Sequence, residues 1–217
     1  AVSDGGTKVF LGGGFTTVGG LAHGRLAAVD PVTGDLITSW KTATKSNLVR
    51  ALATVSNRLY VGGSFSRIGG KDVNRLAAVN QTTGVVDATF APRPNNTVRA
   101  VGVSPDGQRV YAGGPFSAIA GVARPGIAEL TATGAATSFA PTDGGVVIAL
   151  DPVPDGSRVF FSTTNNRTWA YDPATSNTPA YRVRTSGDVQ AIEATDDEVY
   201  IGGHFSGLPE AKLERKT

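Results

Sequence analysis

The stretch LYVGGSF at residues 59–65 decides the fold, because copies of it return along the whole chain. Clear copies end at Phe15, Phe116 and Phe205, and a degenerate copy, VFFSTTN, covers residues 159–165. The first four copies follow one another about every 50 residues, and the last step is about 40 residues. A period of this length indicates a repeat architecture.

Each full unit contains four short segments typical of β-strands, and the second unit shows them best. The predicted strands there cover residues 49–54, 58–61, 74–79 and 85–90, and turns that contain glycine or asparagine separate them. Four strands in a unit of about 40 to 50 residues is the composition of a propeller blade. The sequence therefore predicts an all-β protein, a β-propeller of four-stranded antiparallel blades.

We predict a single β-propeller domain over residues 1–217, with units near 1–45, 46–94, 95–143 and 144–185 and an incomplete unit at 186–217. This division gives about four and a half blades. The last unit repeats a strand that the first unit already has, so a closed ring of four blades fits poorly. We expect a larger ring of about six to eight blades, with seven preferred. The remaining blades would come from the same polypeptide or from another chain.

Aromatic residues recur at two places in the repeat, after the glycine pair and at the end of the fourth strand. One blade cannot bury both of its faces alone, so these side chains are expected to pack between neighbouring blades. The glycine pairs would permit positive φ, a bulge or a close backbone approach. The expected structural aromatics are Phe15, Trp40, Phe65, Phe90, Phe116, Phe139, Tyr181 and Phe205.

The repeat as a whole, GGxF(S/T)x(V/I)GG followed by RLAAV(D/N)xxTG, resembles the tandem-repeat propellers of secreted actinobacterial proteins. The likeness is close over residues 15–40 and 65–92, moderate over 116–141 and weak in the fourth unit. It implies an extracellular propeller of about seven blades without shared catalytic residues. A weaker likeness to quinoprotein propellers covers one unit only, and the cofactor-binding residues of that class have no counterpart here. We therefore expect no cofactor.

Composition narrows the function further. The chain has no cysteine, which excludes disulfides and cysteine-based metal or redox sites. Charged residues make up 18% of the chain and the net charge is +2, so we expect no nucleic-acid partner. No apolar run approaches the length of a membrane span. The low charge and the abundance of small residues favour a secreted, extracellular protein.

The usual catalytic motifs do not occur: the chain has neither a GxSxG elbow nor a P-loop. His23 and His204 lie in different units without a carboxylate at ligand spacing, so no metal site is expected. Paired carboxylates could still serve a carbohydrate-active enzyme, although most of them lie in turns, where aspartate bonds the backbone. The carboxylates concerned are Asp143, Asp151, Asp155, Asp188, Asp196 and Asp197.

Loops on a rigid scaffold commonly carry binding, and the long ones lie at residues 18–24, 68–74 and 119–125. In the fourth unit a short polar turn at 163–167 replaces this loop and could form a notch. The candidate binding residues are His23, Lys71, Asp72, Arg124, Asn165 and Arg167. We predict a secreted, non-catalytic binding or interaction propeller that recognises a protein or glycan through loops on one face. Two alternatives stay open, a carbohydrate-active enzyme with acids at the propeller mouth and a structural repeat region of a larger cell-surface protein.

Overall fold

The computed structural model describes residues 1–44, 47–142, 145–175 and 177–207, and its regular structure is strands plus the 3-10 turn η1 (Asp4–Gly6). The strands are β1 (Val9–Gly12), β2 (Thr17–Val18), β3 (Leu21–Ala22), β4 (Leu26–Val29), β5 (Val49–Val55), β6 (Arg58–Gly63), β7 (Leu76–Asn80), β8 (Ala100–Val103), β9 (Arg109–Gly113), β10 (Ala118–Ile119), β11 (Val122–Ala123), β12 (Ile127–Thr131), β13 (Val147–Pro152), β14 (Val159–Thr163), β15 (Arg167–Tyr171), β16 (Tyr181–Arg184), β17 (Val189–Ala194) and β18 (Val199–Gly203).

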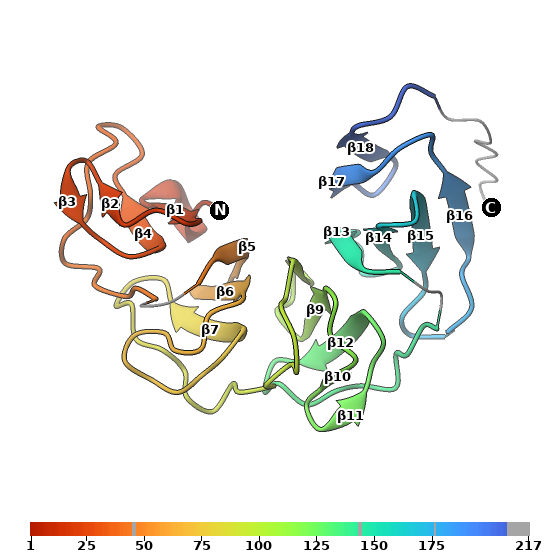
Figure 1. Cartoon of the computed structure of the whole chain (residues 1–217), viewed down its shortest axis with the longest axis horizontal. Coiled ribbons are helices and arrows are strands. Elements are labelled where there is room, and N and C mark those ends of the chain that lie inside the picture. The colour runs from red at the N-terminus through yellow and green to blue at the C-terminus, as the bar shows by residue number, and fades with distance from the viewer. Residues whose placement is uncertain (45–46, 143–144, 176, 208–217) are drawn as a thin grey trace.

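These strands form consecutive antiparallel units around an arc that is open on one side (Figure 1). The first strand of each unit lies on the inside of the arc, and the later strands follow outward in chain order, as in β5–β6–β7 and β13–β14–β15–β16. In the first unit the inner strand is reduced to a bridge between Val2 and Val9. The predicted all-β propeller fold is confirmed. The blade number of a full ring stays a prediction, and the unit boundaries expected at 45–46 and 143–144 and the segment 208–217 lie outside the described residues.

The fourth strand is shorter than predicted in the first three units, where it makes a single bridge to the third strand. The chain then turns because local side-chain bonds compete with the ladder. In the second unit the Asp87 carboxylate accepts a hydrogen bond from the Thr89 N–H at 3.0 Å, and this turn directs Phe90 into the interior. The fourth unit has a full strand, β16, and Tyr181 begins that strand instead of ending it.

The hydrophobic core is divided into clusters that lie between neighbouring units. Phe10 and Trp40 of the first unit pack with Leu59 and Phe65 of the second, and Tyr60 and Phe90 of the second pack with Phe116 of the third. This division follows from the two-residue period of a strand: Leu59 and Tyr60 are neighbours in β6 and therefore face opposite units.

Five of the eight expected structural aromatics are fully buried, and the other three are half-buried. The buried ones are Trp40, Phe65, Phe90, Phe116 and Phe139; the half-buried ones are Phe15, Tyr181 and Phe205. Aromatic side chains of the second strand and the fourth segment contact each other within a unit, with ring centroids 5.3 Å apart for Phe10–Trp40 and for Tyr60–Phe90.

The fourth unit lacks a phenylalanine after its second strand, and another aromatic residue occupies the corresponding face. Trp169 in β15 pairs with Phe161, the register position that Ala77 and Ala128 hold in the two preceding units. The Trp169 side chain is 2% exposed and packs toward the third unit with Tyr111 and Phe139. Trp169, a large residue at a position where two other units have alanine, thus fills space in the fourth unit. It lies on the face that Phe65 covers in the second unit.

The first glycine of each pair allows the next unit to pack directly on the second strand. A Cβ on Gly62 would lie 2.7 Å from Val101 Cγ2 and 2.8 Å from Val98 Cγ1, and a Cβ on Gly12 would lie 2.5 Å from Val49 Cγ1. Neither glycine has a positive φ. Positive φ, a bulge and close approach were the three explanations considered for the glycine pairs. For these first glycines the explanation is close approach.

We expect Phe90→Ala to lower the free energy of unfolding by about 3–5 kcal/mol, because the ring is fully buried between two units. Urea unfolding followed by circular dichroism measures the change. Val32→Ala is the control, since Val32 is 90% exposed, and it should stay within about 0.5 kcal/mol of wild type. Wild-type stability of the Phe90 variant would contradict the packing described above.

Gly62→Ala should destabilise the protein by about 1–3 kcal/mol, because its methyl group overpacks the contact with Val98 and Val101. Gly202 holds the same place in β18, but a Cβ there would meet only Ala191 Cβ at 3.9 Å. Gly202→Ala is thus the matched control and should melt close to wild type. Equal melting temperatures of the two variants would show that the close approach at Gly62 does not matter.

Candidate functional site

A bulge at the start of the first strand recurs in the units and turns one side chain out of the regular alternation. The pairing register shifts between Val49 and Ala51 in β5, and again between Val147 and Ala149 in β13 and between Val189 and Ala191 in β17. Bulges are common beside functional sites because they redirect a side chain. The residues at this position are Arg50, Ile148 and Gln190, and Arg99 holds the same place before β8.

The second glycine of each pair lies opposite this bulge. A Cβ on Gly63 would collide with the carbonyl oxygen of Leu48, and a Cβ on Gly203 would collide with that of Asp188. Both contacts lie within a unit, so the second glycine lets the start of the first strand lie against the end of the second. In these units the second glycine thereby allows the bulge residue to lie at the inner edge of the arc.

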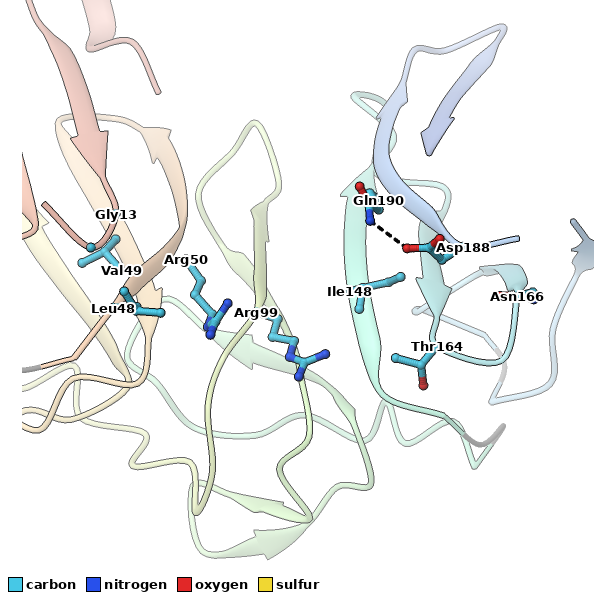
Figure 2. A pocket seen from close by; sticks show the side chains of 11 residues that line it. Gly13, Leu48, Val49, Arg50, Arg99, Ile148, Thr164, Asn166, Asp188 and Gln190 are labelled. Atoms are coloured by element: carbon cyan, nitrogen blue, oxygen red, sulfur yellow. Dashed lines mark hydrogen bonds between the residues drawn. The ribbon is translucent and has the colours of Figure 1, made fainter. Parts of the chain in front are cut away.

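The bulge residues line a cavity of about 830 Å³ at the inner edge of the arc, which we call the axial cavity. Its wall comes from all five units, as Figure 2 shows. The volume lies in the range of small-molecule binding sites. The lining residues are Gly13, Gly14, Leu48, Val49, Arg50, Arg99, Ile148, Thr164, Asn166, Asp188 and Gln190.

The two walls of the axial cavity differ in charge. The side chains of Arg50 and Arg99 extend from the second and third units toward the space that separates them from the fourth and fifth (Figure 2). The opposite wall carries Asp188, which accepts a hydrogen bond from Gln190 Nε2 at 2.7 Å and lies 3.6 Å from His204 Nδ1. One wall is therefore cationic, and the other offers a carboxylate and neutral polar groups.

The candidate binding residues predicted from the loops do not line the axial cavity. Two of them are engaged near the loops themselves: Asp72 pairs with Arg67 at 2.9 Å, and Arg124 donates to the Thr137 carbonyl. Lys71 is exposed in the same loop as Asp72, and His23 is half-buried with its backbone N–H bonded to the Thr16 carbonyl. Their role in binding stays a prediction.

The short turn of the fourth unit reaches the axial cavity, but through different residues from those predicted. Thr164 and Asn166 line it, whereas Asn165 between them accepts a hydrogen bond from the Thr163 hydroxyl. Arg167 lies over the Trp169 ring at 5.9 Å from its centroid. Residues 164–166 form a tight turn in which Asn166 has a φ of 61°. The neighbours of the predicted residues therefore line the cavity instead.

Sequence reasoning missed Arg50 and Arg99. The signal that could have found them is variation at one place of a regular repeat: the residue after the buried valine of the first strand is Arg, Arg, Ile and Gln in successive units. Simple alternation hides this position, because the bulge is a shift in the pairing of the first strand with the second.

Two of the six acidic residues considered for an enzyme, Asp155 and Asp196, accept hydrogen bonds from backbone N–H groups in turns. The Asp155 carboxylate accepts from the Ser157 N–H at 2.7 Å, and the Asp196 carboxylate accepts from the Asp155 N–H at 3.0 Å. Asp197 lies in the same turn as Asp196, and Asp143 lies outside the described residues. Asp188 is the carboxylate that the described residues place on the wall of the axial cavity.

Among the residues that the structure describes, no group of three histidine or acidic side chains is placed to hold a metal ion. The same residues contain no helix that is long and apolar enough to cross a membrane.

Asp151 joins the fourth and fifth units and titrates unusually. Its Oδ2 accepts a hydrogen bond from the Ala194 N–H at 2.8 Å. Burial raises the pKa of the Asp151 carboxyl to about 6, the Ala194 bond opposes this rise, and the negative charge of Glu193 adds to it. The pKa of Asp151 is raised because its carboxyl group is buried where the fourth and fifth units meet.

Stability should therefore depend on pH through Asp151. Its folded-state pKa exceeds the unfolded value of about 3.9, so the folded protein binds the proton more tightly, and the Asp151 contribution to stability falls as pH rises from about 4 to 6. Asp151→Asn keeps an oxygen acceptor for Ala194 and removes the titration. We compare the melting temperature of the variant minus that of wild type at two pH values. We expect this difference to be more positive at pH 7.5 than at pH 4.

The control for this experiment is Asp155→Asn. Hydrogen bonds from the Ser157 hydroxyl and N–H lower the pKa of Asp155, so its charged form stabilises the fold at neutral pH and the variant should lose stability at pH 7.5 relative to pH 4. A melting-temperature difference for Asp151→Asn that is the same at both pH values would disprove the assignment.

A family model described as a domain of unknown function (DUF5122) beta-propeller matches residues 56–90. The matched stretch runs from the turn before β6, through the Gly62–Gly63 pair and β7, to Phe90. No curated protein matches the chain. Over the matched stretch the chain is thus similar to a β-propeller repeat family, in agreement with the architecture of the folded units.

Proposed function

We propose that this chain is a non-catalytic binding propeller that recognises a protein or glycan through one face. The face is the one at which the first strands begin and the second strands end, and it contains the axial cavity. The observation that carries the proposal is that one recurring position presents arginine in the second and third units, isoleucine in the fourth and glutamine in the fifth. A rigid position with a variable side chain is what recognition on a repeat scaffold requires.

The loops between the second and third strands belong to the same face, because they continue from the glycine pairs that end the second strands. The hairpin β2–β3 and the hairpin β10–β11 extend these loops in the first and third units. In the fourth unit the tight turn at 163–167 stands in their place and contributes Thr164 and Asn166 to the cavity wall. A ligand in the axial cavity could therefore extend toward the loops.

We also propose that the protein acts outside the cell. The low share of charged residues and the abundance of small polar residues support this, as does the likeness of the repeat to secreted actinobacterial propellers. The alternative of a carbohydrate-active enzyme requires two carboxylates about 5–10 Å apart, and Asp188 is the carboxylate on the described cavity wall. The alternative of a purely structural repeat region predicts no ligand.

The proposal is tested by filling the axial cavity. The chain is applied to an array of neutral and acidic oligosaccharides and of peptides, and each bound compound is then measured against Thr164→Trp. Thr164 is an exposed residue of the cavity wall, so a tryptophan there should occupy the cavity without disturbing the core, and affinity should fall at least about ten-fold. Ala174→Trp is the matched control, because Ala174 is exposed in the turn at the opposite ends of the strands.

Recovery of the bound compound unchanged, as shown by mass spectrometry, supports a binding protein, whereas a shortened oligosaccharide would support the enzyme. Equal affinity of both tryptophan variants would place recognition away from the axial cavity. Failure of every compound on the array to bind would favour the structural repeat region.

A further inference from the structure

The axial cavity holds two arginine side chains from consecutive units. Arg50 is the bulge residue of the second unit, and Arg99 holds the same place in the third. Arg50 is exposed and Arg99 half-buried. Among the described residues, neither guanidinium forms an ion pair or a side-chain hydrogen bond.

Several other arginines of the chain are bound to oxygen acceptors. Arg58 pairs with Asp87 and also donates to the Ala132 carbonyl at 2.8 Å, and Arg75 donates to the Pro94 carbonyl at 3.1 Å. These arginines connect segments of the scaffold. Arg50 and Arg99 connect none, and both extend into the same cavity (Figure 2).

Asp188, the acidic residue of the described cavity wall, forms no ion pair with Arg50 or Arg99. Asp188 belongs to the opposite wall, where it is bonded to Gln190 and lies beside His204. The guanidinium group is a planar fork of donors that fits the oxygens of a carboxylate or a sulfate. Two such forks side by side in a concave site therefore favour an anionic group.

The opposite wall indicates what the anionic group is attached to. Thr164, Asn166, Asp188 and Gln190 offer hydroxyl, amide and carboxylate groups, each of which can hydrogen-bond a hydroxyl. The apolar part of the described wall is aliphatic, Leu48, Val49 and Ile148, and it contains no pocketed aromatic anchor of the kind that dominates protein interfaces. This chemistry suits a polyhydroxylated ligand better than a peptide.

We infer that Arg50 and Arg99 form the anion-binding subsite for an acidic saccharide, whose carboxylate or sulfate lies between the two guanidinium groups and whose hydroxyls meet the wall of Thr164, Asn166 and Gln190. This inference rests on the proposed function, because it names the ligand class of the same cavity. The cavity volume of about 830 Å³ sets the size of the bound part at a few sugar residues.

The test is calorimetric titration of the full chain with four probes. Trigalacturonic acid supplies carboxylates, a heparin-derived tetrasaccharide supplies sulfates, maltotriose is the neutral sugar, and penta-glutamate is the acidic peptide. We expect one or both acidic sugars to bind at least about ten-fold more tightly than maltotriose and penta-glutamate. The affinity should also fall as salt concentration rises.

Arg50→Gln and Arg99→Gln should each weaken binding of the acidic sugar about ten-fold or more, and Arg50→Lys should restore part of the loss because lysine keeps the charge without the fork. The matched control is Arg182→Gln, which removes the same charge from an exposed position of β16 and should bind as wild type does. Thermal melts of all variants show that each is folded.

Two outcomes would overturn the inference while leaving the proposed function intact. One is binding of maltotriose that equals binding of the acidic sugars and does not change in the arginine variants. The other is tighter binding of penta-glutamate than of either acidic sugar. If no probe binds and Thr164→Trp has no effect on any ligand of the array, the inference and the proposed function are both wrong.

Discussion

The close approach of the glycine pair to neighbouring backbone and side chains is the constraint on which the rest of this structure depends. The first glycine gives room to a valine of the next unit, as Gly62 does for Val98, and the second gives room to a carbonyl of its own unit, as Gly63 does for Leu48. In that unit a Cβ at either position would overlap these atoms. The units can therefore stack with apolar faces in contact, and burial of those faces supplies the main stabilising free energy.

The same contact separates the residues that hold the fold from those available for recognition. The bulge makes neighbours in sequence serve different purposes. Val49 belongs to the core between units, although it also borders the axial cavity, whereas the exposed Arg50 side chain extends into that cavity. Substitution at the bulge position changes the cavity wall and leaves the core clusters as they are. This arrangement explains how a repeated strand pairing carries arginine, isoleucine and glutamine at one equivalent place.

The fourth unit shows how far the repeat can change while the packing is kept. It has Ser162 and Thr163 in place of the glycine pair and no phenylalanine after them, and Trp169 fills the same face from a neighbouring strand. At its other face, the Asp151 carboxylate accepts the hydrogen bond of a backbone N–H in the fifth unit. Both cases follow from the general requirement that interiors are filled and that buried polar groups find partners.

The sequence by itself determined the repeat, the order of strands within a unit and the positions of the aromatics that pack between units. These are local properties: alternation, turn residues and a fixed period can be read without knowing which segments meet. Fourth-strand length was predicted less well, because side-chain bonds such as that of Asp87 end the ladder early. Only the tertiary structure decided where the axial cavity lies and which residues line it. Arg50, Arg99 and Asp188 are far apart in the chain, and they share one cavity because the units curve into an arc and the bulges turn the side chain of each first strand toward its centre.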